Sequence, residues 1–234
     1  MAYMIKGRCD FWINGISART VGLVVDELRP PPMARQRYTV WRTGVDSDRA
    51  SPDDEYESPE YHIRARIIGQ PKFNPSPVYA FLSTARTLKL STQEGYYFKI
   101  QQVLGINPTT SLKGNEQVYD IGFIIAPFKY YTDNEEITVN TDTITNPGTR
   151  YSRPVYKITH SGACTLTVNG QELNIASAAS SPIFIDAERM FAYNSSGENQ
   201  TKHTTGQYPF LQPGQNAIAS TGAGLTVVGN WRDY

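Results

Sequence analysis

The C-terminal part of the chain consists of short strand-like segments separated by turn-forming residues. The segments are rich in β-branched and aromatic residues, and Gly, Asn, Ser or Pro stand between them. Val168 is followed by Asn169-Gly170, a pair typical of a two-residue hairpin turn. Seven such segments occur, at 155–159, 164–168, 171–175, 183–186, 190–193, 216–220 and 225–229. This pattern predicts a β-sandwich or jelly roll.

The N-terminal part of the chain combines strand-like segments with one predicted helix. Residues 61–68, 96–103 and 117–127 are rich in Ile, Val, Phe and Tyr, which favours strands. Ser76-Pro77 provides a helix start, because Ser can cap a helix and Pro fits its first turn. Apolar residues then recur at helical spacing, at Val78, Phe81, Leu82, Ala85 and Leu88. We expect a helix over 77–89.

A polar run separates these two parts. Residues 129–150 are rich in Thr, Asn, Asp and Glu and end in Asn146-Pro147-Gly148-Thr149-Arg150, a composition typical of a domain boundary or linker. We therefore expect two domains, 1–140 and 141–234. The predicted fold class is mainly β, with an N-terminal β-sandwich or barrel-like domain that contains the helix and a C-terminal β-sandwich.

Charge and apolar patterning exclude several classes of protein. The chain has 22 Lys plus Arg and 22 Asp plus Glu, so its formal net charge is zero. A protein that grips nucleic acid is usually clearly basic, which argues against that class. No segment has the length of a signal peptide or of a membrane span, so we expect synthesis in a cytoplasm and no membrane partner. Cys9 and Cys164 lie far apart, which favours two free thiols.

The most acidic segment of the chain does not match a metal site. Residues 43–60 carry seven carboxylates and one arginine, which favours an exposed loop or arm. Asp46, Asp48 and Glu57 fall at positions one, three and twelve of a calcium loop, but Ala50 and Ser51 stand where a ligand and the turn glycine are needed. A solvated charged arm is the favoured interpretation.

No catalytic constellation is apparent elsewhere. His62, His160 and His203 are isolated in sequence and have no second ligand at metal spacing. Asp186 and Glu188 would project from one face of a strand, as a glycosidase pair must, but nothing indicates a raised pKa, and chance spacing is favoured. We expect no catalytic residue, no metal and no cofactor, and hence a protein that is not an enzyme.

Aromatic residues leave one binding function open. Tyr193, Tyr208, Phe210 and Trp231 could stack on sugar rings in a lectin-like sandwich. The alternative, that these rings fill the core, is favoured. Tyr208 and Trp231 remain the candidates for glycan stacking in a carbohydrate-binding protein that recognises a host surface.

Several motifs resemble the distal tail protein family of long-tailed bacteriophages. In the N-terminal part they are residues 11–17 (FWINGIS), the predicted helix, and the strand that ends in residues 126–130 (APFKY). In the C-terminal part they are residues 146–149 (NPGT), 161–170 (SGACTLTVNG), 185–190 (IDAERM) and 208–216 (YPFLQPGQN). Their order and the total length support the resemblance over nearly the whole chain.

The resemblance implies a structural hub of the virion tail tip, or baseplate, that serves host attachment. Family members have an N-terminal β domain that contains one helix, and six copies of this domain close a homohexameric ring, single or stacked. Their C-terminal domain is a galectin-like sandwich on the outside of the ring. The ring joins the tail tube to the tail-associated lysin or fibre hub and lets DNA pass through its lumen. In some members the outer domain holds receptor-binding proteins or carries a sugar-binding insertion, for which this sequence has no room.

A ring needs two complementary surfaces on each subunit. Arg29, Arg35, Arg37 and Arg42 form a basic stretch with no acidic residue between them, and the acidic segment follows at once. We hypothesise that the basic stretch of one subunit meets the acidic arm of its neighbour, with Asp53, Asp54 and Glu55 as the contacts. The alternative, that both are unrelated solvated faces, stays open.

Overall fold

The computed structural model describes residues 9–25, 27–42, 48–68, 74–110 and 116–234. Within these ranges it describes only the backbone of residues 38–42, 48–55, 109, 110 and 116. The chain forms two compact units, Met1–Lys129 together with Tyr234 (unit 1) and Tyr130–Asp233 (unit 2). Antiparallel sheets dominate both units, which confirms the predicted mainly β fold class.

One large antiparallel sheet organises unit 1. Its strands lie in the order β2 (Ile16–Ser17), β1 (Phe11–Ile13), β7 (Thr87–Leu90), β8 (Tyr96–Thr110), β9 (Glu116–Tyr131), β6 (Glu60–Ile68) and β3 (Val24–Val25), and β20 (Arg232–Asp233) also pairs with β9. Polar and apolar residues alternate along β6, so that one face is buried and the other is wet. The buried face carries Tyr61, Ile63, Ala65 and Ile67.

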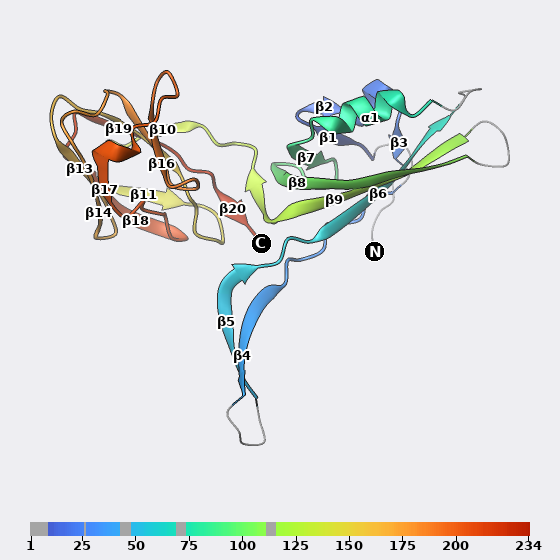
Figure 1. Cartoon of the computed structure of the whole chain (residues 1–234), viewed down its shortest axis with the longest axis horizontal. Coiled ribbons are helices and arrows are strands. Elements are labelled where there is room, and N and C mark those ends of the chain that lie inside the picture. The colour runs from blue at the N-terminus through green and yellow to red at the C-terminus, as the bar shows by residue number, and fades with distance from the viewer. Residues whose placement is uncertain (1–8, 26, 43–47, 69–73, 111–115) are drawn as a thin grey trace. The chain divides into compact units, whose positions relative to one another are not determined.

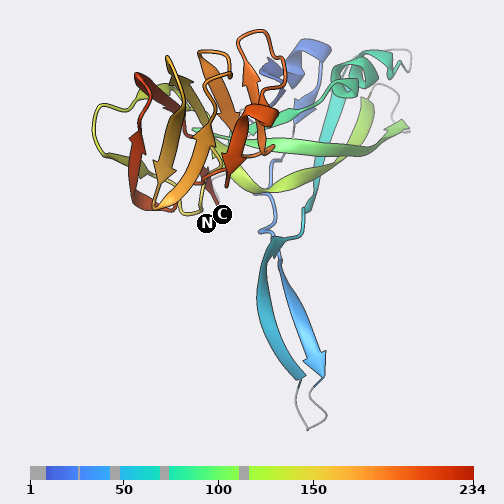
Figure 2. The same cartoon turned by 60° about the vertical axis from the view of Figure 1, so that its left-hand side comes forward.

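The helix of unit 1 is shorter than its apolar pattern predicts. Helix α1 spans Ser76–Ser83 and packs near β8 and the 3₁₀ helix η1 (Ala18–Val21) (Figures 1 and 2). Its N-terminus is held by the Asn74 side chain, which accepts from the Ser76 N–H at 3.2 Å. The prediction is wrong beyond Ser83, because Leu88, the last apolar residue of the predicted pattern, belongs to β7, which pairs with β1 and β8.

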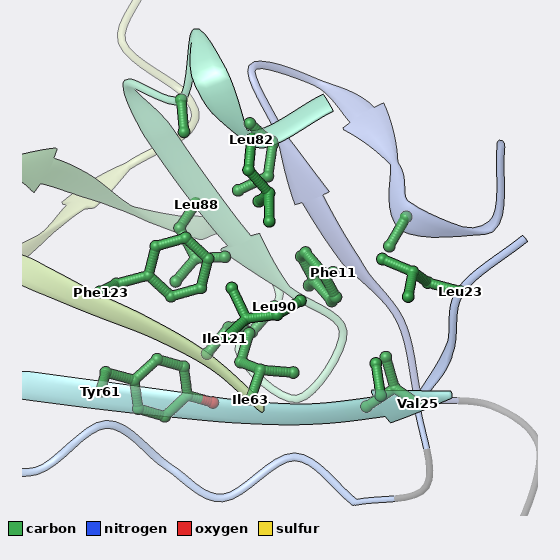
Figure 3. Close-up of a cluster of buried hydrophobic side chains, with 14 of the residues drawn as sticks. Phe11, Leu23, Val25, Tyr61, Ile63, Leu82, Leu88, Leu90, Ile121 and Phe123 are labelled. Atoms are coloured by element: carbon green, nitrogen blue, oxygen red, sulfur yellow. The ribbon is translucent and has the colours of Figure 1, made fainter. Parts of the chain in front are cut away.

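The core of unit 1 lies between the sheet and the elements that cover it. Figure 3 shows Phe11, Leu88 and Phe123 from the sheet together with Leu82 from α1. These side chains are at most 1% exposed. Burying a large apolar side chain contributes about 1.5–3 kcal/mol, so this cluster provides much of the stability of the unit.

Residues that precede β6 form a separate hairpin, which we call the arm. It consists of β4 (Gln36–Arg42) and β5 (Asp48–Tyr56), which pair antiparallel in a two-stranded sheet of their own (Figure 1). Within the described part of the chain, no third strand extends this sheet. The predicted exposed loop or arm over 43–60 therefore contains a complete strand.

Unit 2 is a two-sheet sandwich. One sheet has the order β10 (Glu136–Thr138), β19 (Gly224–Val228), β12 (Val155–Thr159), β15 (Ile183–Asp186), β16 (Phe191–Asn194). The other has the order β11 (Thr143–Asn146), β18 (Gly214–Ser220), β13 (Cys164–Val168), β14 (Gln171–Ile175), β17 (Thr204–Gly206). Buried residues such as Tyr156, Leu166 and Val227 form its core. The predicted C-terminal sandwich is confirmed.

The predicted Asn-Gly turn and the polar run 129–150 both contain regular structure. Asn169 and Gly170, with φ of 48° and 81°, connect β13 to β14 as the hairpin signal predicts. The polar run 129–150 contains strands β10 and β11, which pair with β19 and β18. The boundary between the units lies between Lys129 and Tyr130, so most of this run belongs to the sandwich.

Candidate interaction sites

The arm carries an acidic bulge. Arg42 lies opposite Asp48 and Tyr38 opposite Pro52, but the next pair is Gln36 with Tyr56. Between these last two pairs β4 has one residue, Arg37, whereas β5 has three, Asp53, Asp54 and Glu55. Two extra residues on one strand make a β-bulge, which interrupts the ladder and re-aims the backbone. The three acidic residues proposed as contacts are thus the bulge itself.

The hairpin changes the setting of the hypothesised inter-subunit contact. The basic and acidic stretches are antiparallel partners within one chain, with Arg42 across from Asp48 and Arg37 across from the bulge. Arg29 and Arg35 lie outside the hairpin and are exposed. Arg29 Nε makes an ion pair with Glu27 Oε1 at 3.2 Å. Contact of these residues with a neighbouring subunit stays a prediction.

Aromatic rings hold the root of the arm. The ring of Tyr56 meets those of Phe128 and Tyr234 edge to face, with centroid distances of 5.1 and 5.9 Å. The Tyr56 and Tyr234 hydroxyls lie 3.0 Å apart and share a hydrogen bond. Met33, which lines the same surface hollow as Tyr56 and Tyr234, is 79% exposed. The root of the arm is therefore fixed to unit 1, and apolar surface lies next to it.

A polar groove follows the wet face of β6 and β9 beside the segment 27–32, and His62 lies in it. His62 Nε2 is 2.7 Å from Glu60 Oε1, and Nδ1 is 3.3 Å from Asp120 Oδ1. The hydrogen bond to Glu60 is the main cause that raises the pKa of His62 above 6.5. A Cβ atom at Gly122 would lie 3.1 Å from the imidazole ring, so the absence of a side chain there makes room for His62. His62 on β6 thus connects this strand to Asp120 on β9.

Three arginines surround one tyrosine in unit 2. The guanidinium carbons of Arg232, Arg150 and Arg153 lie 4.4, 5.2 and 5.7 Å from the centroid of the Tyr151 ring. The ring of Phe210 meets the same tyrosine edge to face at 5.4 Å. We call these five residues the Tyr151 cluster. Arg153 is exposed, Arg150, Tyr151 and Phe210 are half-buried, and Arg232 is buried.

Buried polar residues hold the loop that carries this cluster. Asn146 is 1% exposed, and its Nδ2 donates to the carbonyl oxygens of Arg150 and Leu211 at 2.9 and 3.1 Å. Its Oδ1 accepts from the Gly148 N–H at 2.9 Å. Asp233 accepts from the Thr149 N–H and hydroxyl at 2.7 and 3.0 Å. The motif at 146–149 therefore has a structural role, because its hydrogen bonds hold this loop in place.

The aromatic candidates for sugar stacking occupy different environments. Trp231 is 5% exposed and packs in the core of unit 2 against Gly229, so its ring does not face solvent. Tyr208 is half-buried, and its hydroxyl lies 3.0 Å from that of Thr204. Sequence reasoning missed a half-buried stack in which Tyr193 lies 5.1 Å from Phe184 and 5.9 Å from Phe191. Only the cross-strand pairing brings Phe184 and Tyr193 together.

The residues tested for chemistry have structural roles. Asp186 Oδ1 accepts from the Glu188 and Arg189 N–H groups at 2.9 and 3.0 Å, which explains the Asp186–Glu188 spacing as a turn. The ring of His160 lies within hydrogen-bonding distance of the Gly162 and Ser180 carbonyls. Among the described residues, no group of three or more His, Cys, Asp or Glu is placed to hold a metal ion. Both cysteines are free thiols.

Within the described part of the chain, no helix has the length and apolar character needed to cross a bilayer.

The fold is similar to that of a solved structure over nearly all of both chains. That structure is described as "Crystal Structure of SPP1 Dit (gp 19.1) Protein, a Paradigm of Hub Adsorption Apparatus in Gram-positive Infecting Phages". The match has a TM-score of 0.71 and covers 96% of this chain and 98% of that chain, at 13% sequence identity. No protein-family model and no curated protein sequence matches this chain. The distal tail fold expected from the sequence motifs is confirmed.

Proposed function

We propose that this protein is a structural hub of a phage tail tip, a distal tail protein that joins the tail tube to the adsorption apparatus. The observation that carries the proposal is the match of both units, in one alignment, to a protein described as a hub of an adsorption apparatus. A two-unit match over 96% of the chain is more specific than a shared sandwich, because common sandwich folds host many functions.

In this proposal six copies close into a ring, single or stacked, through heterologous contacts. The arm supports a role in assembly, because an isolated two-stranded ribbon is marginally stable until something covers it. The proposed partners of the protein are the tail tube protein, the tail-associated lysin or fibre hub, and a receptor-binding protein, which binds the outer, galectin-like sandwich. DNA passes through the lumen only transiently. The protein is made in the host cytoplasm, ends in the virion tail tip, and is not an enzyme.

The mass of the purified protein in solution tests the ring. Light scattering coupled to size exclusion should give six times the 26.2 kDa of one chain, or twelve times for stacked rings. Negative-stain images should show a particle with an open centre. A monomer at all concentrations and salt strengths, with native circular dichroism, would exclude the ring.

The arm contact has its own test. Replacing Asp53, Asp54 and Glu55 with lysine should loosen the ring, because these acidic residues are proposed to meet the basic stretch of a neighbour, which consists of Arg29, Arg35, Arg37 and Arg42. The expected change is a larger monomer fraction in sedimentation velocity, which increases further with salt because screening weakens exposed ion pairs. An unchanged ring at moderate salt would reject the contact.

A carbohydrate-binding function is the second candidate. The half-buried stack of Phe184, Tyr193 and Phe191 supports it, since aromatic rings on a sandwich face can bind sugars. Glycan-array binding that is lost in Tyr193→Ala or Tyr208→Ala, with the fold intact, would favour this function. Trp231→Ala is unsuitable, because removing a core ring would destabilise the sandwich.

A further inference from the structure

Strand β8 has an open edge over residues 101–107, which we call the β8 edge. On the side away from β9, β8 pairs with β7 at Phe98 and Lys99, and the Ile100 N–H donates to the Arg86 carbonyl at 2.7 Å. Beyond Ile100, no strand and no backbone hydrogen bond reaches this side of β8 within the described part of the chain. Pro108, which has no N–H, ends the edge.

Backbone groups of alternate residues point out of the β8 edge. Residues of a strand that share one face also turn their N–H and C=O groups toward the same edge. Val103 packs against the core of unit 1, as Ile100 does, and Ile100 turns its N–H toward this side. Val103, and by alternation Gly105 and Asn107, therefore present their N–H and C=O groups here. Such groups are a template for a further strand.

The β8 edge is accessible and carries no charge. Gln102 and Asn107 are exposed, and Leu104 is 40% exposed. A Cβ atom at Gly105 would meet no atom within 4 Å, so the backbone there is open to a close approach. No residue from 100 to 108 is charged, although 19% of the chain is. Proteins protect open edges with charged residues, so an uncharged open edge indicates one that a partner covers.

Leu104 and helix α1 lie on opposite faces of the sheet. A Cβ atom at Gly122 would lie 3.3 Å from the Leu104 Cβ and 3.1 Å from the His62 ring, which places Leu104 on the wet face. Val78 and Leu82 of α1 are at most 1% exposed and belong to the core on the buried face. A strand added at the β8 edge would therefore contact Leu104 on the side away from the helix.

A second copy of the same edge fits this template. Antiparallel pairing of two identical strands gives a two-fold contact, in which the same surface of each copy meets the other. Identical charged edges would set like charges against each other, which the uncharged β8 edge avoids. Pairing centred on Gly105 sets Val103 opposite Asn107, so the outward groups of both edges are matched. The same register sets Leu104 opposite Ile106, an apolar cross-strand pair.

We propose that the β8 edge is a two-fold contact that binds the β8 edge of a second copy of this chain by antiparallel strand pairing. The contact joins the large sheets of the two copies. For its place in the assembly the inference rests on the proposed function, because in a ring of six copies this contact stacks two rings. Without a ring, the same contact gives a dimer.

Opposite charges at position 104 test this contact in the full-length protein. In the proposed register the two Leu104 side chains are diagonal neighbours on one face, so Leu104→Lys and Leu104→Glu each place like charges side by side. Each variant also loses the Leu104–Ile106 pair twice, once on each side of the two-fold axis. The dissociation constant of the doubled species should therefore rise at least about tenfold, which corresponds to 1.4 kcal/mol. Sedimentation velocity should show half the wild-type mass.

Mixing the two variants shows whether residue 104 meets its own copy. Lysine then faces glutamate, so the mixture should associate more tightly than either variant alone. A mixture that associates no more tightly would overturn the inference, because residue 104 would then meet a different surface. A wild-type protein whose mass never doubles, or a Leu104→Lys protein whose mass is unchanged, would overturn it as well.

Ile137→Lys is the matched control. Ile137 is 38% exposed, close to the value for Leu104, and lies on strand β10 of unit 2. Its replacement should leave the mass unchanged, and an effect equal to that of Leu104→Lys would refute the contact. Circular dichroism and melting temperature show that each variant is folded.

The ring and the β8 edge fail separately in these measurements. Ring formation multiplies the mass of one chain by six, whereas the β8 edge multiplies it by two. A dimer that never forms a ring would refute the ring and support the edge, and a single ring of six copies would do the reverse. In the doubled species, the amides of Val103, Gly105 and Asn107 should exchange at least about tenfold more slowly than in Leu104→Lys. Equal exchange in both would refute pairing at this edge.

Discussion

Asn146→Asp should destabilise unit 2 strongly, although it changes the side chain by only one group. In the native protein the Asn146 amide donates to the carbonyls of Arg150 and Leu211 at 2.9 and 3.1 Å, in a site that is 1% exposed. Aspartate keeps the acceptor for the Gly148 N–H but sets an oxygen against two carbonyl oxygens. Each buried polar group that loses its partner costs about 1–3 kcal/mol, so the expected loss is about 4 kcal/mol near neutral pH.

The loss should depend on pH with a definite sign. Burial among carbonyls raises the pKa of the new carboxyl above its unfolded value, because the charged form is disfavoured. The protonated acid can donate to one carbonyl, so the variant is most stable below the unfolded pKa of about 4 and loses stability as pH rises through the folded pKa. The gap between wild type and variant should therefore widen from acid to neutral pH.

Urea unfolding followed by Trp231 fluorescence measures this effect in unit 2. Trp12→Phe and Trp41→Phe leave Trp231 as the only tryptophan of three, and it lies in the core of unit 2. Asn174→Asp is the control. Asn174 is exposed, and its Oδ1 accepts a hydrogen bond from the Thr165 hydroxyl at 2.8 Å, which an aspartate oxygen can also accept. A loss below about 1 kcal/mol, or one equal to that of the control, would refute the structural role of Asn146.

Three further variants or reagents probe other sites. His62→Gln should flatten the pH dependence of the melting temperature of unit 1. The raised pKa of His62 stabilises the folded protein fully below about pH 6.5, and this stabilisation is lost as the pH rises above that value. A variant whose melting temperature depends on pH as steeply as that of the wild type would contradict this prediction. Gly206→Ala, at φ 124° against the Glu172 carbonyl, should cost unit 2 about 2–3 kcal/mol by urea unfolding, while Gly162→Ala in open space should be near neutral. Iodoacetamide should modify half-buried Cys9 before Cys164, whose pKa burial raises; peptide mass spectrometry would show the opposite order if Cys164 were accessible.

Sequence reasoning succeeded where the determinants are local. The Asn169-Gly170 turn and the alternation along β6 depend on neighbouring residues, and both are found in the structure. The predicted helix extends beyond the observed one because Leu88 satisfies a helical spacing as well as a strand spacing, and only the pairing of its strand β7 with β1 and β8 decides between them. A short apolar run does not distinguish the two periodicities.

The candidate sites depended on contacts that no local pattern reveals. The prolines and carboxylates of residues 43–60 predict an exposed loop or arm and give no sign of strand β5, because a two-stranded ribbon tolerates proline at an edge. The Tyr151 cluster joins residues 150–153 to Phe210 and Arg232. Its only sequence signal was the local run Arg150-Tyr151-Ser152-Arg153, which carries no spacing rule.

The two-strand width of the arm has a kinetic consequence. Because β4 and β5 pair only with each other in the described part of the chain, their outer N–H and C=O groups lack strand partners, and amide hydrogens there should exchange with solvent faster than those of the large sheet. Protection acquired at these amides upon multimerisation would time the moment when each subunit captures the next. Pulsed deuterium labelling of the arm amides would therefore measure the rate of assembly.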